Sequence, residues 1–99
     1  MREMIRELAA AFLSRESDRT SLITVTNVDL AKDLHNAIIL ISVYPREEEE
    51  RALQFVWRRR DDFKEYVKKH SKFKRIPHFK FDIDHGEKHR QKIDELLQN

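Results

Sequence analysis

Residues 22–44 read LITVTNVDLAKDLHNAIILISVY, and this stretch decides the fold. Residues 22–29 are rich in β-branched side chains, which is typical of a strand. Residues 37–44 predict a second strand that is apolar on both faces. Helices should therefore cover one of its faces, and the strand should be central in a sheet or lie against a partner. The connection over 30–36 is too long for a two-residue turn and favours a wide antiparallel hairpin.

Helical periodicity flanks this hairpin on both sides. Residues 2–15 predict an amphipathic helix, because apolar side chains recur there at helical spacing: Met4, Ile5, Leu8, Ala9, Phe12 and Leu13. On the other side, Pro45 ends the strand and suits the start of a helix. Four glutamates over 47–50 then occupy the first turn of that helix, where they complement its dipole.

The region after Pro45 should contain two helices joined by a kink. Its apolar stripe stops over 58–62 and then resumes with Phe63. Asp62 and Glu65 have the spacing of a capping box, with Asp62 as the N-cap of the second helix. Pro77 closes the helical region and favours an extended conformation at Ile76.

The last part of the chain predicts a strand, a turn and a helix. Residues 78–84 alternate between apolar side chains that face inward and polar ones that face solvent: Phe79, Phe81 and Ile83 inward, Lys80, Asp82 and Asp84 outward. Gly86 marks a turn, and residues 87–98 predict a short terminal helix with Ile93, Leu96 and Leu97 on one side. The 99 residues therefore predict one α+β domain over 1–99, with helices on one face of a three-stranded sheet.

Composition excludes several classes of protein. The chain has no cysteine, which rules out disulfides, thiolate metal ligands and a cysteine nucleophile. No apolar run approaches the roughly 20 residues that span a bilayer, and the N-terminal residues lack the apolar region of a signal peptide. There is no Ser-His-Asp spacing, Gly-rich phosphate loop or paired glutamate arrangement. We therefore expect a cytoplasmic protein that is not an enzyme and needs no cofactor or small-molecule substrate.

Positive charge is concentrated in residues 58–75, which we call the basic block. The segment holds nine Lys or Arg and three acids, so it carries +6, whereas the net charge of the whole chain is +2. Such a block indicates a directed electrostatic surface, usually for nucleic acid, although a solvated helix face is the plainer reading. Four of the bases would line one face of a regular helix: Lys64, Lys68, Lys72 and Arg75. The candidate RNA-binding residues are Arg58, Arg59, Arg60, Lys64, Lys68, Lys69, Lys72, Lys74 and Arg75.

Two aromatic residues and two histidines have competing interpretations. Trp57 and Tyr66 lie near the basic block and suit stacking on bases, but both lie on the apolar stripe, where packing in the core is the commoner outcome. His85 and His89 have metal-ligand spacing, yet no third ligand is set by the sequence and Gly86 interrupts a helix there. We therefore expect a solvated strand face and a turn, with Asp84 capping the turn or the helix, and no metal.

The order of the elements, without the last helix, is that of type II KH domains. Residues 23–37 (ITVTNVDLAKDLHNA) resemble the ribosome-binding factor A family, in which a strand and a V-x-L/M-S-x-D-L motif precede an Ala-led second strand. Residues 76–82 (IPHFKFD) resemble the I/V-P-E-L-x-F third strand of that family. Asp84 and the pattern of Ile93, Leu96 and Leu97 resemble its ending. The resemblance covers residues 2–97.

The chain departs from the family pattern in three places. The small-x-Gly kink between the two central helices falls at residues 59–61, where there is no glycine. The basic segments before the first helix and at the C-terminal end are short or missing. As in the family, the GxxG loop with which ordinary KH domains clamp a nucleic-acid backbone is lacking, so a clamp of that kind is not expected.

The resemblance implies a role in ribosome biogenesis. A member of this family is expected to bind the small (30S) ribosomal subunit transiently and to assist maturation and processing of 16S rRNA without catalysis, as a cytoplasmic monomer. Asp33 matches the family's acid in the hairpin connection, where a carboxylate bonds backbone donors. The alternative is a protein-interaction module whose basic helical face binds an acidic partner.

Overall fold

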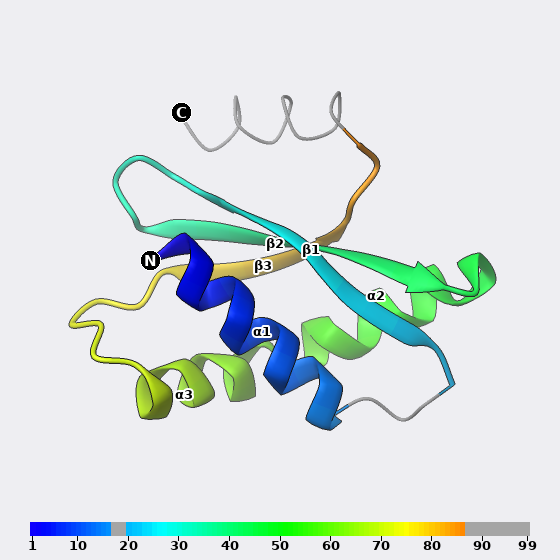
Figure 1. The fold of residues 1–99 in the computed structure, drawn as a ribbon, viewed down its shortest axis with the longest axis horizontal. Coiled ribbons are helices and arrows are strands. Elements are labelled where there is room, and N and C mark those ends of the chain that lie inside the picture. The colour runs from blue at the N-terminus through cyan, green and yellow to red at the C-terminus, as the bar shows by residue number, and fades with distance from the viewer. Residues whose placement is uncertain (17–19, 87–99) are drawn as a thin grey trace.

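The computed structural model describes residues 1–16 and 20–86 (Figure 1). The elements follow the expected order: α1 (Arg2–Glu16), β1 (Leu22–Leu30), β2 (Asn36–Tyr44), a 3-10 turn η1 (Arg46–Glu48), α2 (Glu49–Arg58), α3 (Arg60–His70) and β3 (His78–Ile83). The helix expected over 87–98 lies outside the described residues. Within the described part, no helix is both long enough and apolar enough to cross a membrane.

The three strands form one mixed sheet in the order β1-β2-β3. β1 pairs with β2 in antiparallel register, and β3 pairs with β2 in parallel, so that Ile41 lies between Val25 and Ile83. The register shifts between Val25 and Asn27, which places a bulge at Thr26. β2 is therefore the central strand, and Ile39, Leu40 and Ile41 are all fully buried, as an apolar run on both faces predicts.

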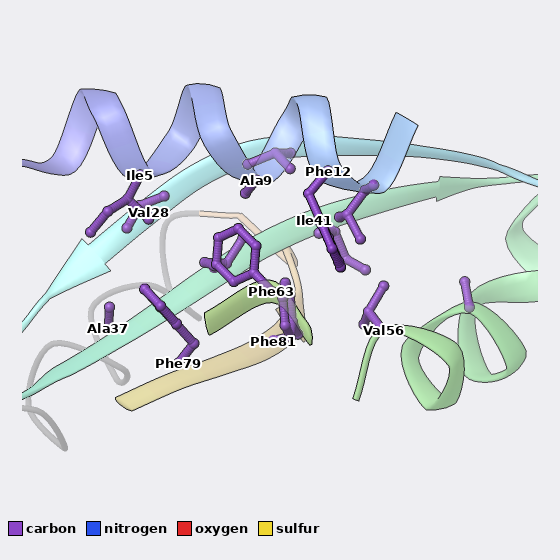
Figure 2. Packing of buried hydrophobic residues seen from close by; sticks show 14 of the residues in the cluster. Ile5, Ala9, Phe12, Val28, Ala37, Ile41, Val56, Phe63, Phe79 and Phe81 are labelled. Carbon is purple, nitrogen blue, oxygen red and sulfur yellow. The ribbon is translucent and has the colours of Figure 1, made fainter. Parts of the chain in front are cut away.

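The helices α1, α2 and α3 lie on the same face of the sheet (Figure 1). α1 packs on β1 and α3, while α2 packs on β3 and β2. The hydrophobic core lies between these two layers, as Figure 2 shows. Phe63 is at its centre, with its ring centroid 4.8 Å from that of Phe79, 5.4 Å from Phe12 and 5.9 Å from Phe81. The inward residues of β3 and the apolar stripe of α1 thus meet on one aromatic ring.

The predicted kink is confirmed, but its cap and the end of the second helix are not as expected. Arg59 occupies the cap position of α3 with φ −95° and ψ 6°, and Asp62 lies inside the helix, so Asp62 is not the N-cap. The Arg59 N–H donates to the carbonyls of Phe55 (3.2 Å) and Val56 (3.1 Å), so the backbone turns without a side-chain cap. α3 ends at His70, and residues 71–77 form a loop rather than the last helical turns before Pro77.

The connection between β1 and β2 is the wide hairpin that its length predicts. The Asp33 carboxylate accepts a hydrogen bond from the His35 N–H (2.9 Å), which confirms the expected role of this acid. Leu34 follows with φ +62°, a left-handed conformation that is unusual for a residue other than glycine. Ala31 closes the loop on both sides, since its carbonyl accepts from the Leu34 N–H and its N–H donates to the Asn36 carbonyl.

Candidate nucleic-acid interface

The basic block begins at the junction of α2 and α3. Arg58 ends α2 and is exposed. The Arg59 guanidinium lies 3.4 Å from the Asp62 carboxylate and 5.6 Å from the centroid of the Phe55 ring. The Arg60 guanidinium lies 4.9 Å from the centroid of the Trp57 ring. Two of the three arginines are therefore positioned by aromatic rings, which limits the side-chain freedom that a ligand would have to remove.

Trp57 holds this junction against the sheet. Its indole N–H donates to the Phe81 carbonyl at 3.0 Å, and 38% of the residue is exposed. The expectation of core packing is therefore wrong for Trp57, because α2 carries it to the margin of β3 rather than between the layers. Tyr66, by contrast, is half-buried, with its ring 5.4 Å from that of Phe12 and stacked 4.1 Å from that of His70, so packing is confirmed for it.

The lysines of α3 have different surroundings. Lys64 is half-buried, whereas Lys68 and Lys69 are exposed. The Lys68 ammonium lies 3.5 Å from the Glu65 carboxylate, an exposed pair that contributes little to stability. Lys64 and Lys68 share a helix face because they are four residues apart.

The remaining bases lie in the loop after α3. Lys72, Lys74 and Arg75 are exposed there, so the helix face expected to join Lys64, Lys68, Lys72 and Arg75 is not formed. Arg75 instead donates to the imidazole Nε2 of His35 at 2.9 Å, which ties this loop to the hairpin loop between β1 and β2. The basic block therefore runs from the α2–α3 junction, near the middle of the helical layer, along α3 and into the loop at one end of the molecule (Figure 1).

A hollow of about 290 Å³ lies where the start of α3 meets β3. It brings Arg60 and Lys64 of the basic block beside His78 and Lys80 of β3, and is lined by Asn36, Arg60, Asp61, Lys64, His78, Phe79 and Lys80. Sequence reasoning placed Lys80 on a solvated strand face and gave His78 no role. Alternation along β3 identified the exposed side of Lys80, but no local pattern shows which helix lies beside that strand.

Asp84, directly after β3, accepts two hydrogen bonds that hold the turn at the end of the strand. The Thr26 hydroxyl at the bulge donates to the Asp84 carboxylate (2.6 Å), which also accepts from the Gly86 N–H (2.9 Å). Asp84 therefore caps the turn, one of its two expected roles. The described residues contain no group of three or more His, Asp or Glu side chains arranged to hold a metal, and His89 lies outside them.

The model of the ribosome-binding factor A family matches residues 1–97, nearly the whole chain. This chain belongs to the ribosome-binding factor A family. Ribosome-binding factor A of Thermomicrobium roseum is 29% identical over 98 residues, a match that spans 96% of this chain and 76% of that protein. The ribosome-binding factor A of Thermodesulfovibrio yellowstonii is 34% identical over 92 residues, spanning 92% of this chain and 78% of the relative.

Solved structures of ribosome-binding factor A share the fold. The crystal structure from Thermus thermophilus gives a TM-score of 0.75 at 22% identity, covering 83% of this chain and 90% of that one. The solution structure of a Thermotoga maritima protein, provisionally assigned as a ribosome binding factor A, gives 0.73 at 23% identity, covering 87% and 85%. The α+β, KH-like fold of type II expected from the sequence is thus confirmed for the described residues.

Proposed function

We propose that this member of the ribosome-binding factor A family binds the small (30S) ribosomal subunit through its basic block and assists the maturation and processing of 16S rRNA. The observation that carries the proposal is the placement of the block. Eighteen residues with a charge of +6 extend from the kink along α3 and the following loop, and most of their basic side chains are exposed. The phosphate backbone of rRNA is a polyanion, so a surface with this excess of Lys and Arg is suited to bind it.

The mechanism we propose is binding without catalysis. Lys and Arg neutralise rRNA phosphates and release condensed counterions, which favours association and makes it sensitive to salt. A protein that binds one conformation of the rRNA better than another shifts the population toward that conformation. Maturation is then assisted by differential affinity alone, with the protein acting in the cytoplasm as a monomer.

Charge reversal on α3 and its loop tests whether the basic block is the surface that binds the small subunit. The double variant Lys68→Glu plus Lys72→Glu should weaken association with purified small subunits by about tenfold or more, because two phosphate contacts become repulsive. The matched control is Arg46→Glu plus Arg51→Glu, which changes the net charge equally but lies on η1 and α2, away from the block. If both double variants weaken binding to the same extent, only net charge matters and the assigned surface is wrong.

The salt dependence of the same association separates RNA from an acidic protein partner. Binding to rRNA through several phosphates predicts a linear fall of log affinity with log salt, with a slope of several units. The Lys68→Glu plus Lys72→Glu variant should show a shallower slope than the control. A slope near zero would favour the protein-interaction module instead.

The maturation step is tested in cells of the source organism. Loss of the protein should raise the ratio of precursor to mature 16S rRNA, and the wild-type chain should restore it. The Lys68→Glu plus Lys72→Glu variant should fail to restore the ratio at equal protein abundance. Restoration by that variant would separate maturation from the basic block.

A further inference from the structure

The hollow between α3 and β3 lies at a free edge of the sheet. Among residues 1–16 and 20–86, β3 is paired on one side only, with β2. The His78 N–H donates to the His35 carbonyl and the Asp84 N–H to the Ile41 carbonyl, both toward β2. In a parallel pair, alternate residues direct their backbone groups to opposite sides, so those of Phe79, Phe81 and Ile83 point to the free edge.

Trp57 covers part of this edge and confirms its direction. The indole N–H donates to the Phe81 carbonyl, which is one of the outward groups. The outward N–H of Phe79 lies two residues earlier, and Phe79 lines the hollow together with the basic side chains. The residue with this outward N–H therefore lines the same hollow as Arg60, Lys64 and Lys80.

The charged side chains of the hollow favour an anion. Arg60, Lys64 and Lys80 line it against one acid, Asp61. Lys64, Lys80 and Asp61 form no ion pair shorter than 4.0 Å within residues 1–16 and 20–86, whereas Arg60 is held over the Trp57 ring. Two ammonium groups that lack a carboxylate partner, one guanidinium on an aromatic support and a backbone N–H make a set of donors suited to phosphate oxygens.

We infer that this hollow binds one backbone phosphate of RNA, with Arg60, Lys64 and Lys80 as charged ligands and the Phe79 N–H as a backbone donor. The inference rests on the proposed function, since it names the group of the rRNA that this part of the interface takes. It adds Lys80 and the Phe79 backbone, which lie outside the basic block, to the interface. The hollow has a volume of about 290 Å³, just below the roughly 300–1,000 Å³ of small-molecule sites, so it has room for a phosphate group.

The first test is an NMR titration of the 15N-labelled chain with a short oligouridylate that has hydroxyl groups at both ends. The Phe79 amide should shift with saturation, together with the amides of Arg60 and Lys64. Lys80→Gln should weaken the apparent affinity about threefold to tenfold, and Asp61→Asn should strengthen it, because the one opposing charge is removed. Lys32→Gln, the same substitution at an exposed lysine of the hairpin loop outside the basic block, is the matched control and should change the affinity less than twofold.

Other outcomes overturn the inference. Shifts that spread over all basic residues without saturation indicate a diffuse ion atmosphere. Saturation by inorganic phosphate, with no response to the oligouridylate, indicates a site for a free phosphate rather than RNA. Shifts of Phe79 and Ile83 on adding an extended peptide, but not RNA, indicate strand addition at this edge.

The phosphate site and the proposed function can be refuted independently of each other. If Lys80→Gln leaves the oligouridylate affinity unchanged while small-subunit association persists, the phosphate site is wrong and the proposed function stands. If the Phe79 amide responds as expected but the chain associates with no ribosomal subunit, the phosphate site stands and the proposed function is wrong.

Discussion

Trp57 shows how one residue links the sheet to the basic junction. Its indole N–H bonds the Phe81 carbonyl at the free edge of β3, and its ring supports the Arg60 guanidinium. The side chain is 38% exposed, so its contribution comes from a hydrogen bond and a ring contact as well as from burial. Its position also covers part of an edge that would otherwise be open to pairing with another chain.

Replacing Trp57 with phenylalanine isolates the hydrogen bond. Trp57→Phe keeps an aromatic ring but removes the donor to Phe81, so the free energy of unfolding should fall by about 1 kcal/mol in urea denaturation. Tyr44→Phe serves as the control, because Tyr44 is 75% exposed and its change should stay within about 0.5 kcal/mol. Equal effects of the two substitutions would mean that the bond does not stabilise the edge.

Leu34 is a second residue whose backbone conformation should lower the stability of the fold, and this effect can be measured. Its φ of +62° is left-handed, a conformation that costs residues other than Gly, Asn and Asp about 1–2 kcal/mol. Leu34→Asn should raise the free energy of unfolding by up to about 1 kcal/mol, because asparagine tolerates this conformation and Leu34 is 44% exposed. A lower free energy of unfolding in the same denaturation experiment would show that Leu34 packing outweighs the backbone strain.

At the scale of elements, the junction of α2 and α3 explains the missing glycine. The family resemblance places a small-x-Gly sequence at residues 59–61, yet Arg59 turns the chain with φ −95° and ψ 6°. A negative φ is open to any L-residue, and Asp61, at the glycine position of that pattern, lies inside α3, so the kink needs no glycine. Residue 59, the small position of that pattern, carries a guanidinium here, so the helix junction contributes to the basic surface.

Substitution of Arg59 tests this reading of the junction. Arg59→Ala should leave the fold intact and cost less than about 1 kcal/mol, because only an exposed ion pair and an exposed ring contact are lost. Arg59→Gly should cost about 0.5–1 kcal/mol more than Arg59→Ala, through the greater entropy of the unfolded chain. Both values come from thermal or urea unfolding. A glycine variant more stable than the alanine variant would mean that the junction is strained.

The elements themselves could largely be predicted from the sequence. Apolar side chains repeat every 2 residues in β3 and about every 3.6 residues in α1, because each element buries one face. These repeats predict the bounds of both elements to within one residue. The end of α3 was misjudged, since Pro77 marks the latest point at which a helix can end, whereas α3 ends at His70 with the Ser71 hydroxyl donating to the Val67 carbonyl. The hollow at Lys80 depends on which helix lies beside β3, and that is set by tertiary packing alone.

At the scale of the whole molecule, charge is separated between the two ends of the helical layer. The basic block extends from the α2–α3 junction to the end formed by α3 and its loop, while Glu47–Glu50 lie at η1 and the start of α2, toward the opposite end (Figure 1). A near-neutral protein with such a separation is attracted to a polyanion in a preferred orientation. Both the charge reversals on α3 and the phosphate site at β3 assume that this end faces the RNA.

The most direct test of the central claim is co-sedimentation of the purified chain with small subunits, large subunits and whole ribosomes at low and moderate salt. We predict selective association with the small subunit that weakens as salt rises. Equal binding to both subunits would indicate general affinity for RNA. Absence of binding to any of the three under all conditions would contradict the proposed function and leave only the shared fold.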